Sequence, residues 1–312
     1  MEPTPDALAM EAARAPGPHP RRSAVLVLAA GIVFGTTGTA RIVAAPDASS
    51  ISVGAIRVLV GGLSMLLLVP FVGGSRRRAL ALWRRPVILL MGAAAAAYQP
   101  CFFGAVASAG VALGTLVAVG AAPILAGILG WAVLGHRPSP AWAAATALAI
   151  TGLVLLSSNA FASSGSLLGV VLALGAAGCI AVYNVSTKPL VDAGVEPMEM
   201  TAAAVTLSGL FLLPGLLLQP LGWLATPGGI ILALYLGVFT AGLANVWLAR
   251  GVHGLGPGPA STLMLADPVT ATLLGVVLLH EPITLTSGIG IVLVLVGLAL
   301  QAAAPRRAPS RT

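Results

Sequence analysis

Long apolar blocks, separated by short polar connections, follow one another along almost the whole 312-residue chain. A helix needs about 20 mostly apolar residues to cross a bilayer. Blocks that reach or approach this length span residues 23–44, 51–72, 86–107, 111–134, 140–158, 167–187, 198–218, 228–250, 258–279 and 283–303. The gaps between them are too short to hold a soluble domain. The pattern therefore predicts an all-α integral membrane protein with about ten transmembrane helices.

The two halves of the chain repeat each other without a gap over spans four and five. Pro123, Ala126, Gly130, Leu134, Gly152, Leu153 and Leu155 recur as Pro268, Ala271, Gly275, Leu279, Gly297, Leu298 and Leu300. Each half holds five spans, and this odd number places the second half upside down in the membrane. We therefore expect two inverted five-helix repeats, residues 23–158 and 167–303, between a disordered tail of residues 1–22 and a short tail of residues 304–312.

The placement of positive charge indicates the orientation. Charged residues make up only 8% of the chain, and its mean hydropathy is +1.00. With both termini in the cytoplasm, fourteen of the 16 Lys and Arg residues lie on the cytoplasmic side, at positions 14, 21, 22, 76, 77, 78, 84, 85, 137, 188, 250, 306, 307 and 311. This agrees with the positive-inside rule and predicts insertion in the plasma membrane. The net charge of +7 thus reflects topology, and it does not predict nucleic-acid binding.

Two ionisable residues stand well inside predicted spans, where a charge is costly and is a functional candidate by default. Arg57 in span two is suited to a substrate carboxylate or phosphate; the alternative is an arginine that bonds backbone carbonyls or extends to the interface. Asp267 in span nine is suited to binding a substrate amine or to proton coupling, because burial disfavours the charged form of a carboxylate. The alternative is a structural cap on a broken helix.

Several other residues are candidates with weaker signals. Pro123 and Pro268 interrupt spans four and nine near mid-depth, and such broken helices often line a transport cavity. Polar or amphipathic side chains within spans three, six and eight can line that cavity or bond between helices; they are Tyr98, Gln99, Asn184, Asn245 and Trp247. His136 and Glu281, at helix ends, are candidates for gating or for capping the backbone.

The order of these motifs resembles the EamA-type repeat of the drug/metabolite transporter superfamily. The second half reads Asp-Pro-Val at 267–269, Leu-His-Glu-Pro at 279–282 and Gly-Leu at 297–298. The first half reads Ala-Pro-Ile at 122–124, Gly-His-Arg-Pro at 135–138 and Gly-Leu at 152–153. Arg57 matches an arginine that the family carries in its second span. His136 stands where the family carries an acidic residue, which is a departure from the pattern.

The resemblance covers nearly all of residues 23–303 and implies transport of a small metabolite. We expect a secondary transporter that exports an amino acid or drug-like solute by alternating access, with proton antiport and a homodimer as further options. An uptake or exchange carrier for a sugar- or nucleotide-linked solute is the alternative within transport, and a non-transport membrane protein is the alternative outside it. The chain shows no grouped acid, base or metal-binding residues, so neither an enzyme nor a metal or cofactor site is predicted.

Overall fold

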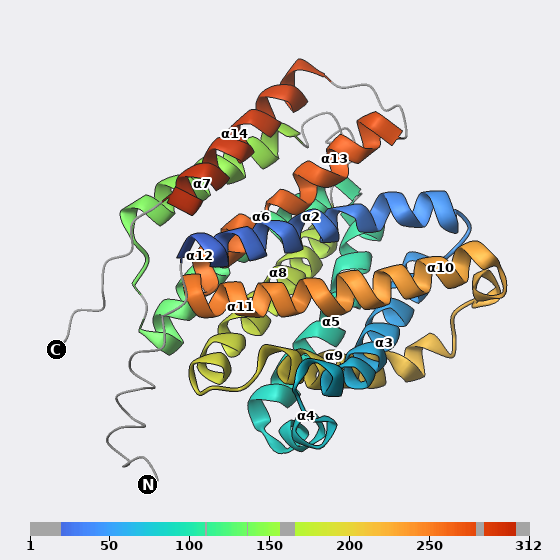
Figure 1. Ribbon diagram of the computed structural model, residues 1–312. Helices are drawn as coiled ribbons and strands as arrows, with labels where there is room; N and C mark the ends of the chain where they lie inside the picture. Colours follow the sequence, from blue (N-terminus) through green and yellow to red (C-terminus); the bar gives the residue numbers. More distant parts are fainter. Residues whose placement is uncertain (1–19, 110, 136, 157–165, 279–283, 304–312) are drawn as a thin grey trace, which may run out of the picture.

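The computed structural model describes residues 20–109, 111–135, 137–156, 166–278 and 284–303, and it contains no strand within them (Figure 1). The first half comprises α2 (Pro20–Ala44), α3 (Ser50–Leu68), η1 (Val69–Val72), α4 (Arg76–Ala81), η2 (Leu82–Arg84), α5 (Pro86–Ala109), α6 (Val111–Leu134) and α7 (Pro140–Leu156). The second comprises α8 (Leu167–Asp192), α9 (Pro197–Leu216), η4 (Gly222–Ala225), α10 (Pro227–Tyr235), the π-helical η5 (Leu236–Ala244), α11 (Asn245–Leu255), α12 (Pro257–Leu263), α13 (Ala266–Leu278) and α14 (Leu285–Ala303).

Each of the ten predicted spans coincides with a helix or a run of helices. Within the described residues, nine helical segments are long and apolar enough to cross a bilayer, and the tenth, α7, is apolar with 17 residues. The all-helical membrane fold is therefore confirmed. The described α2 starts at Pro20, three residues before the expected start of about residue 23. Proline favours the first turn of a helix because the N–H it lacks would be unpaired there.

Equivalent helices of the two halves run antiparallel where they meet. In the α7–α14 pair, a Cβ on Gly152 would lie 2.6 Å from Val294 N, and one on Gly290 would lie 2.5 Å from Leu156 N. Residues with higher numbers on α7 thus face residues with lower numbers on α14, so the two helices are antiparallel. The same holds for α3 and α9, because Gly62 faces Thr206 whereas Gly209 faces Leu59. Since each pair joins the same helix of the two repeats, the halves are inverted relative to each other.

The first helix of each half packs into the other half. Helix α8 lies against α5 and α6 of the first half, and α2 lies against α11, α12 and α13 of the second half. Figure 1 shows α2 in blue beside the orange α11 and α13. This reciprocal exchange places elements of both repeats around the same central volume. A site in the middle of the bundle is therefore built from both halves.

The interior is rich in small residues, and many large apolar side chains lie on the outside of the bundle. Alanine is the commonest buried apolar residue, and many Leu, Ile, Val and Phe side chains are exposed. This inverts the arrangement of a soluble protein, but it suits a bilayer. Lipid tails are as apolar as leucine, so helices associate through close backbone packing, which small residues permit.

Candidate functional site

The ninth span is broken next to Asp267. Helix α12 ends at Leu263 and α13 begins at Ala266, with a tight turn between them. In this turn Leu265 N donates to Thr262 O at 3.0 Å, and Asp267 N donates to Met264 O at 3.0 Å. The break places the carboxylate of Asp267 in the first turn of α13, where the exposed N–H groups and the helix dipole favour a negative charge. The helix break thus lies at Met264 and Leu265, three to four residues before Pro268.

The expected break at Pro123 is not found, and this corrects the prediction of a symmetric pair. Helix α6 continues from Val111 to Leu134 with Pro123 inside it. A proline removes one backbone hydrogen bond. It does not by itself end a transmembrane helix, because neighbouring helices can pack against the segments before and after it. The two prolines differ in the residue that precedes them. Ala122, which precedes Pro123, is buried and apolar, whereas the acidic Asp267 precedes Pro268. The charged member of the pair therefore lies at the broken helix.

Three residues from different helices converge deep in the bundle. Arg57 of α3, Tyr98 of α5 and Asp267 of α13 interact electrostatically with one another. Arg57 and Tyr98 belong to the first repeat, and Asp267 belongs to the second. Each of the three is a separate candidate in the sequence. Only the packing of the repeats shows that they share one location.

Arg57 and Asp267 do not form a contact ion pair. The described part of the chain contains four ion pairs within 4.0 Å, and none of them joins these two residues. Both side chains are only partly buried. Arg57 Nε has no hydrogen-bond partner. A buried donor without a partner is costly, so a ligand that accepts a hydrogen bond from Arg57 would be favoured here.

Glycines bring the neighbouring helices close to this site. A Cβ on Gly35 of α2 would lie 2.5 Å from Asp267 O, so α2 contacts the break directly. A Cβ on Gly54 of α3 would lie 2.5 Å from the side-chain Oε1 of Gln99. Gln99 is buried. Gly54, against which it packs, lies three residues before Arg57 and therefore on the same face of α3. The predicted residue Gln99 thus adjoins the site.

The other predicted cavity residues contact helices instead. Asn184 Nδ2 donates to Ser261 Oγ at 2.8 Å and joins α8 to α12. Asn245 Nδ2 donates to Ala241 O at 3.0 Å, and thereby pairs a carbonyl of the π-helical η5. Trp247 packs against the apolar core around α2, α12 and α13. His136 and Glu281 lie outside the described residues.

A buried carboxylate that sequence analysis did not select lies at the start of α9. Glu199 is 5% exposed and accepts hydrogen bonds at Oε1 from Ser75 N at 2.7 Å and from Arg78 Nε at 2.8 Å. The interaction ties the connection between α3 and α5 to the second repeat. Its only sequence signal is an acidic residue two positions after Pro197, which starts the helix. That signal could not be told from an ordinary first-turn acid.

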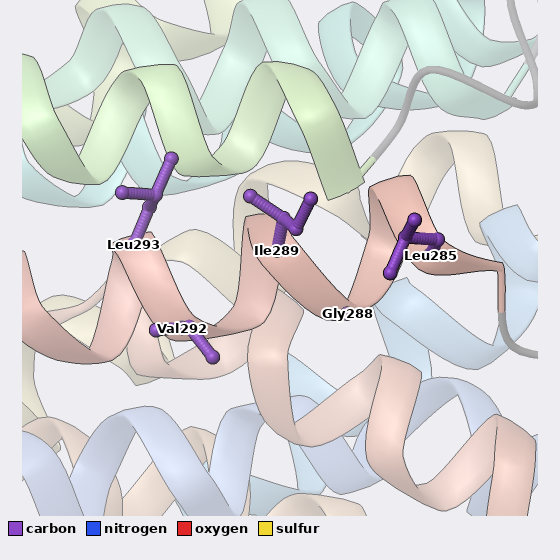
Figure 2. A pocket seen from close by; sticks show the side chains of 5 residues that line it. All are labelled: Leu285, Gly288, Ile289, Val292 and Leu293. Atoms are coloured by element: carbon purple, nitrogen blue, oxygen red, sulfur yellow. The ribbon is translucent and has the colours of Figure 1, made fainter.

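A groove on α14 is separate from this site. It is lined by Leu285, Gly288, Ile289, Val292 and Leu293, and Figure 2 shows Ile289 and Leu293 pointing toward α7. These residues carry no polar side chain, so the groove offers no group for recognising or coupling a polar solute. Nor do the described residues contain a cluster of three or more His, Cys, Asp or Glu that would hold a metal ion.

The fold and the site define a class: a polytopic α-helical membrane protein with two inverted repeats and charged residues at their meeting point. Comparison with known proteins gives the family. The model of the EamA-like transporter family matches residues 21–158 and 167–302, and the chain belongs to this family.

Two relatives agree with this assignment. The chain is 39% identical over 284 residues to the uncharacterised transporter YwfM of Bacillus subtilis (strain 168), with 91% of this chain and 94% of the relative covered. A solved crystal structure superposes with a TM-score of 0.76 at 21% identity, covering 89% of this chain and 95% of the other. That likeness supports the fold alone.

Proposed function

We propose that the protein exports a small zwitterionic metabolite of the amino-acid type across the plasma membrane, with both termini in the cytoplasm. The observation that carries this proposal is that Arg57 and Asp267, from different repeats, interact electrostatically without a contact ion pair. A guanidinium binds a carboxylate through two parallel hydrogen bonds, and a carboxylate binds an ammonium group. One amino acid offers both partners at once.

The location of Asp267 suggests how transport is driven. A carboxylate that accepts either a proton or the substrate ammonium binds only one of them at a time. Proton and substrate then compete for the same oxygen atoms, and each must leave before the other binds. Such competition yields antiport, in which an inward proton gradient drives the solute outward. The break between α12 and α13 lies beside this residue, as in transporters whose discontinuous helices frame the binding site.

The contribution of both repeats to the site favours alternating access. Arg57 lies on a helix of the first repeat and Asp267 on a helix of the second. Rocking one repeat against the other changes which membrane face reaches the space between them. A ligand that bridges the two residues is therefore released when the halves separate on one side.

The proposal is tested by solute flux in proteoliposomes that contain the purified protein. Amino acids are screened by counterflow, and uphill transport is measured with and without an imposed pH gradient. We expect the wild-type protein to couple the two gradients, and Asp267→Asn to abolish uphill transport. Asp47→Asn, the same chemical change at an exposed residue outside the site, serves as the control. Uphill transport that survives Asp267→Asn would rule out antiport through this residue, and flux of nucleotide-linked sugars instead of amino acids would favour the alternative carrier.

A further inference from the structure

The connection between α3 and α5 carries five arginines within ten residues, at positions 76, 77, 78, 84 and 85. We call residues 73–85, which include α4 and η2, the basic connection. It joins two helices that span the membrane, so it lies at the boundary between lipid and water. Figure 1 shows α4 at the edge of the bundle, beyond the labelled bodies of α3 and α9.

Two of the five arginines hold the basic connection in place. Arg76 Nε and Nη2 donate to Leu66 O at 2.9 Å and Leu67 O at 3.0 Å, and so pair carbonyls at the C-terminal end of α3. Arg78 forms an ion pair with Glu199 at 2.8 Å. The guanidinium groups of Arg76 and Arg78 are therefore engaged in contacts within the protein.

Hydrogen bonds from other groups of the basic connection add to this anchoring. Trp83 Nε1 donates to Ala203 O of α9 at 3.0 Å, and Ser75 N donates to Glu199. The basic connection therefore has a defined position against the second repeat, and its remaining side chains project from a fixed base.

The other three arginines, Arg77, Arg84 and Arg85, are exposed, and their guanidinium groups form no hydrogen bond or ion pair with any described residue. The two carboxylates at the start of α9 do not neutralise them, because Glu199 pairs with Arg78 and Glu196 pairs with Arg250. The basic connection thus presents three positive charges outward.

Large apolar side chains accompany these charges. Phe71, just before the basic connection, is 81% exposed, and Leu80 within it is 43% exposed. Apolar side chains beside unpaired arginines match the two layers of a membrane interface, with acyl chains below and phosphates above. Water alone would favour the charges but not the exposed Phe71.

We propose that the basic connection binds the phosphate head groups of anionic phospholipids through Arg77, Arg84 and Arg85, while Phe71 and Leu80 contact the acyl region. Arginine engages phosphate oxygens with two parallel hydrogen bonds. Each arginine near an anionic surface increases partitioning about fivefold, so three together give on the order of 100-fold. Because Arg78 and Trp83 fasten the same segment to α9, bound lipid stabilises the contact between the two repeats. This inference does not depend on the transported solute.

The test compares the protein in nanodiscs of phosphatidylcholine with and without phosphatidylglycerol, using the thermal unfolding midpoint and retention of phosphatidylglycerol in native mass spectrometry. The test variant is R77Q/R84Q/R85Q. The control is R21Q/R22Q/R137Q, which removes the same charge from exposed residues elsewhere on the side predicted to be cytoplasmic. The R77K/R84K/R85K variant keeps the charge, and circular dichroism verifies that each variant is folded.

We expect phosphatidylglycerol to raise the midpoint of the wild-type, control and lysine variants, and added salt to reduce the rise because it screens exposed charges. The glutamine variant should lose most of the rise and most of the retained lipid. An unchanged rise in the glutamine variant, an equal loss in the control, or no rise in the wild-type protein would each overturn the proposal. So would an equal rise from inorganic phosphate added to phosphatidylcholine nanodiscs, because it would identify a free anion as the ligand.

Discussion

Arg57 of α3 and Asp267 of α13 interact electrostatically across the two repeats without forming an ion pair within 4.0 Å. Two opposite charges held apart inside a protein are less stable than a paired arrangement, because each is deprived of water. This separation is the observation behind the proposed binding of a ligand that carries both complementary charges.

Arg57→Gln should weaken binding of an amino acid far more than binding of the corresponding amine that lacks the carboxylate. A hydrogen bond to a charged group contributes about 1.5–3 kcal/mol, so we expect the apparent KM for the amino acid to rise about 10- to 100-fold. The measurement is counterflow in proteoliposomes with both solutes. Arg22→Gln, at an exposed position, is the matched control. An equal effect on amino acid and amine would contradict carboxylate recognition by Arg57.

Gly35→Ala should disrupt the contact between α2 and the break in span nine. Its Cβ would lie 2.5 Å from Asp267 O and 2.6 Å from Thr270 Cβ, and overpacking of this kind costs about 1–3 kcal/mol. We expect a lower unfolding midpoint in detergent and reduced transport. Gly38→Ala is the control in the same helix, because a Cβ there meets nothing within 4 Å. That variant should be unchanged or slightly more stable, since alanine favours helix over glycine. Indistinguishable effects of the two substitutions would refute the close approach.

Glu199→Gln should destabilise the protein more than Glu196→Gln. Glu199 is buried and joins Arg78 and the backbone of Ser75, so loss of its charge should cost about 1–2 kcal/mol, allowing for the exposure of Arg78. Glu196 makes a half-exposed pair with Arg250 at 3.3 Å, and such pairs contribute less than about 1 kcal/mol. Thermal unfolding in detergent measures both. Equal midpoints of the two variants would show that the buried Glu199 contact contributes no more than the exposed Glu196 pair.

The predicted orientation places Asp47 outside and Arg137 inside the cell. A cysteine at either exposed position can be labelled in a protein whose own Cys101 and Cys179 have been replaced by alanine. We expect a membrane-impermeant maleimide on intact cells to label Asp47→Cys but not Arg137→Cys, and to label both after permeabilisation. The reverse pattern would invert the topology. Labelling of both from outside would mean that one of the spans between them does not cross the membrane.

The apolar blocks by themselves determined the helices and their number, because a bilayer core accepts only segments whose backbone groups are all hydrogen-bonded internally. The repeat around Pro123 and Pro268 and the odd span count likewise determined the inverted relation of the halves, which the antiparallel α7 and α14 display. Charged residues inside spans drew attention to Arg57 and Asp267 individually, because such positions are costly in lipid.

Only the tertiary structure decided which of the selected residues meet. Tyr98 joins Arg57 and Asp267, whereas Asn184 bonds Ser261 and Asn245 bonds the carbonyl of Ala241. A polar residue in the sequence of a span does not show which of these roles it has, because the same residue types line cavities and form hydrogen bonds to neighbouring helices. The distinction depends on how the helices are rotated and on how closely glycines such as Gly35 and Gly54 let them approach, and both follow from packing between segments far apart in the chain.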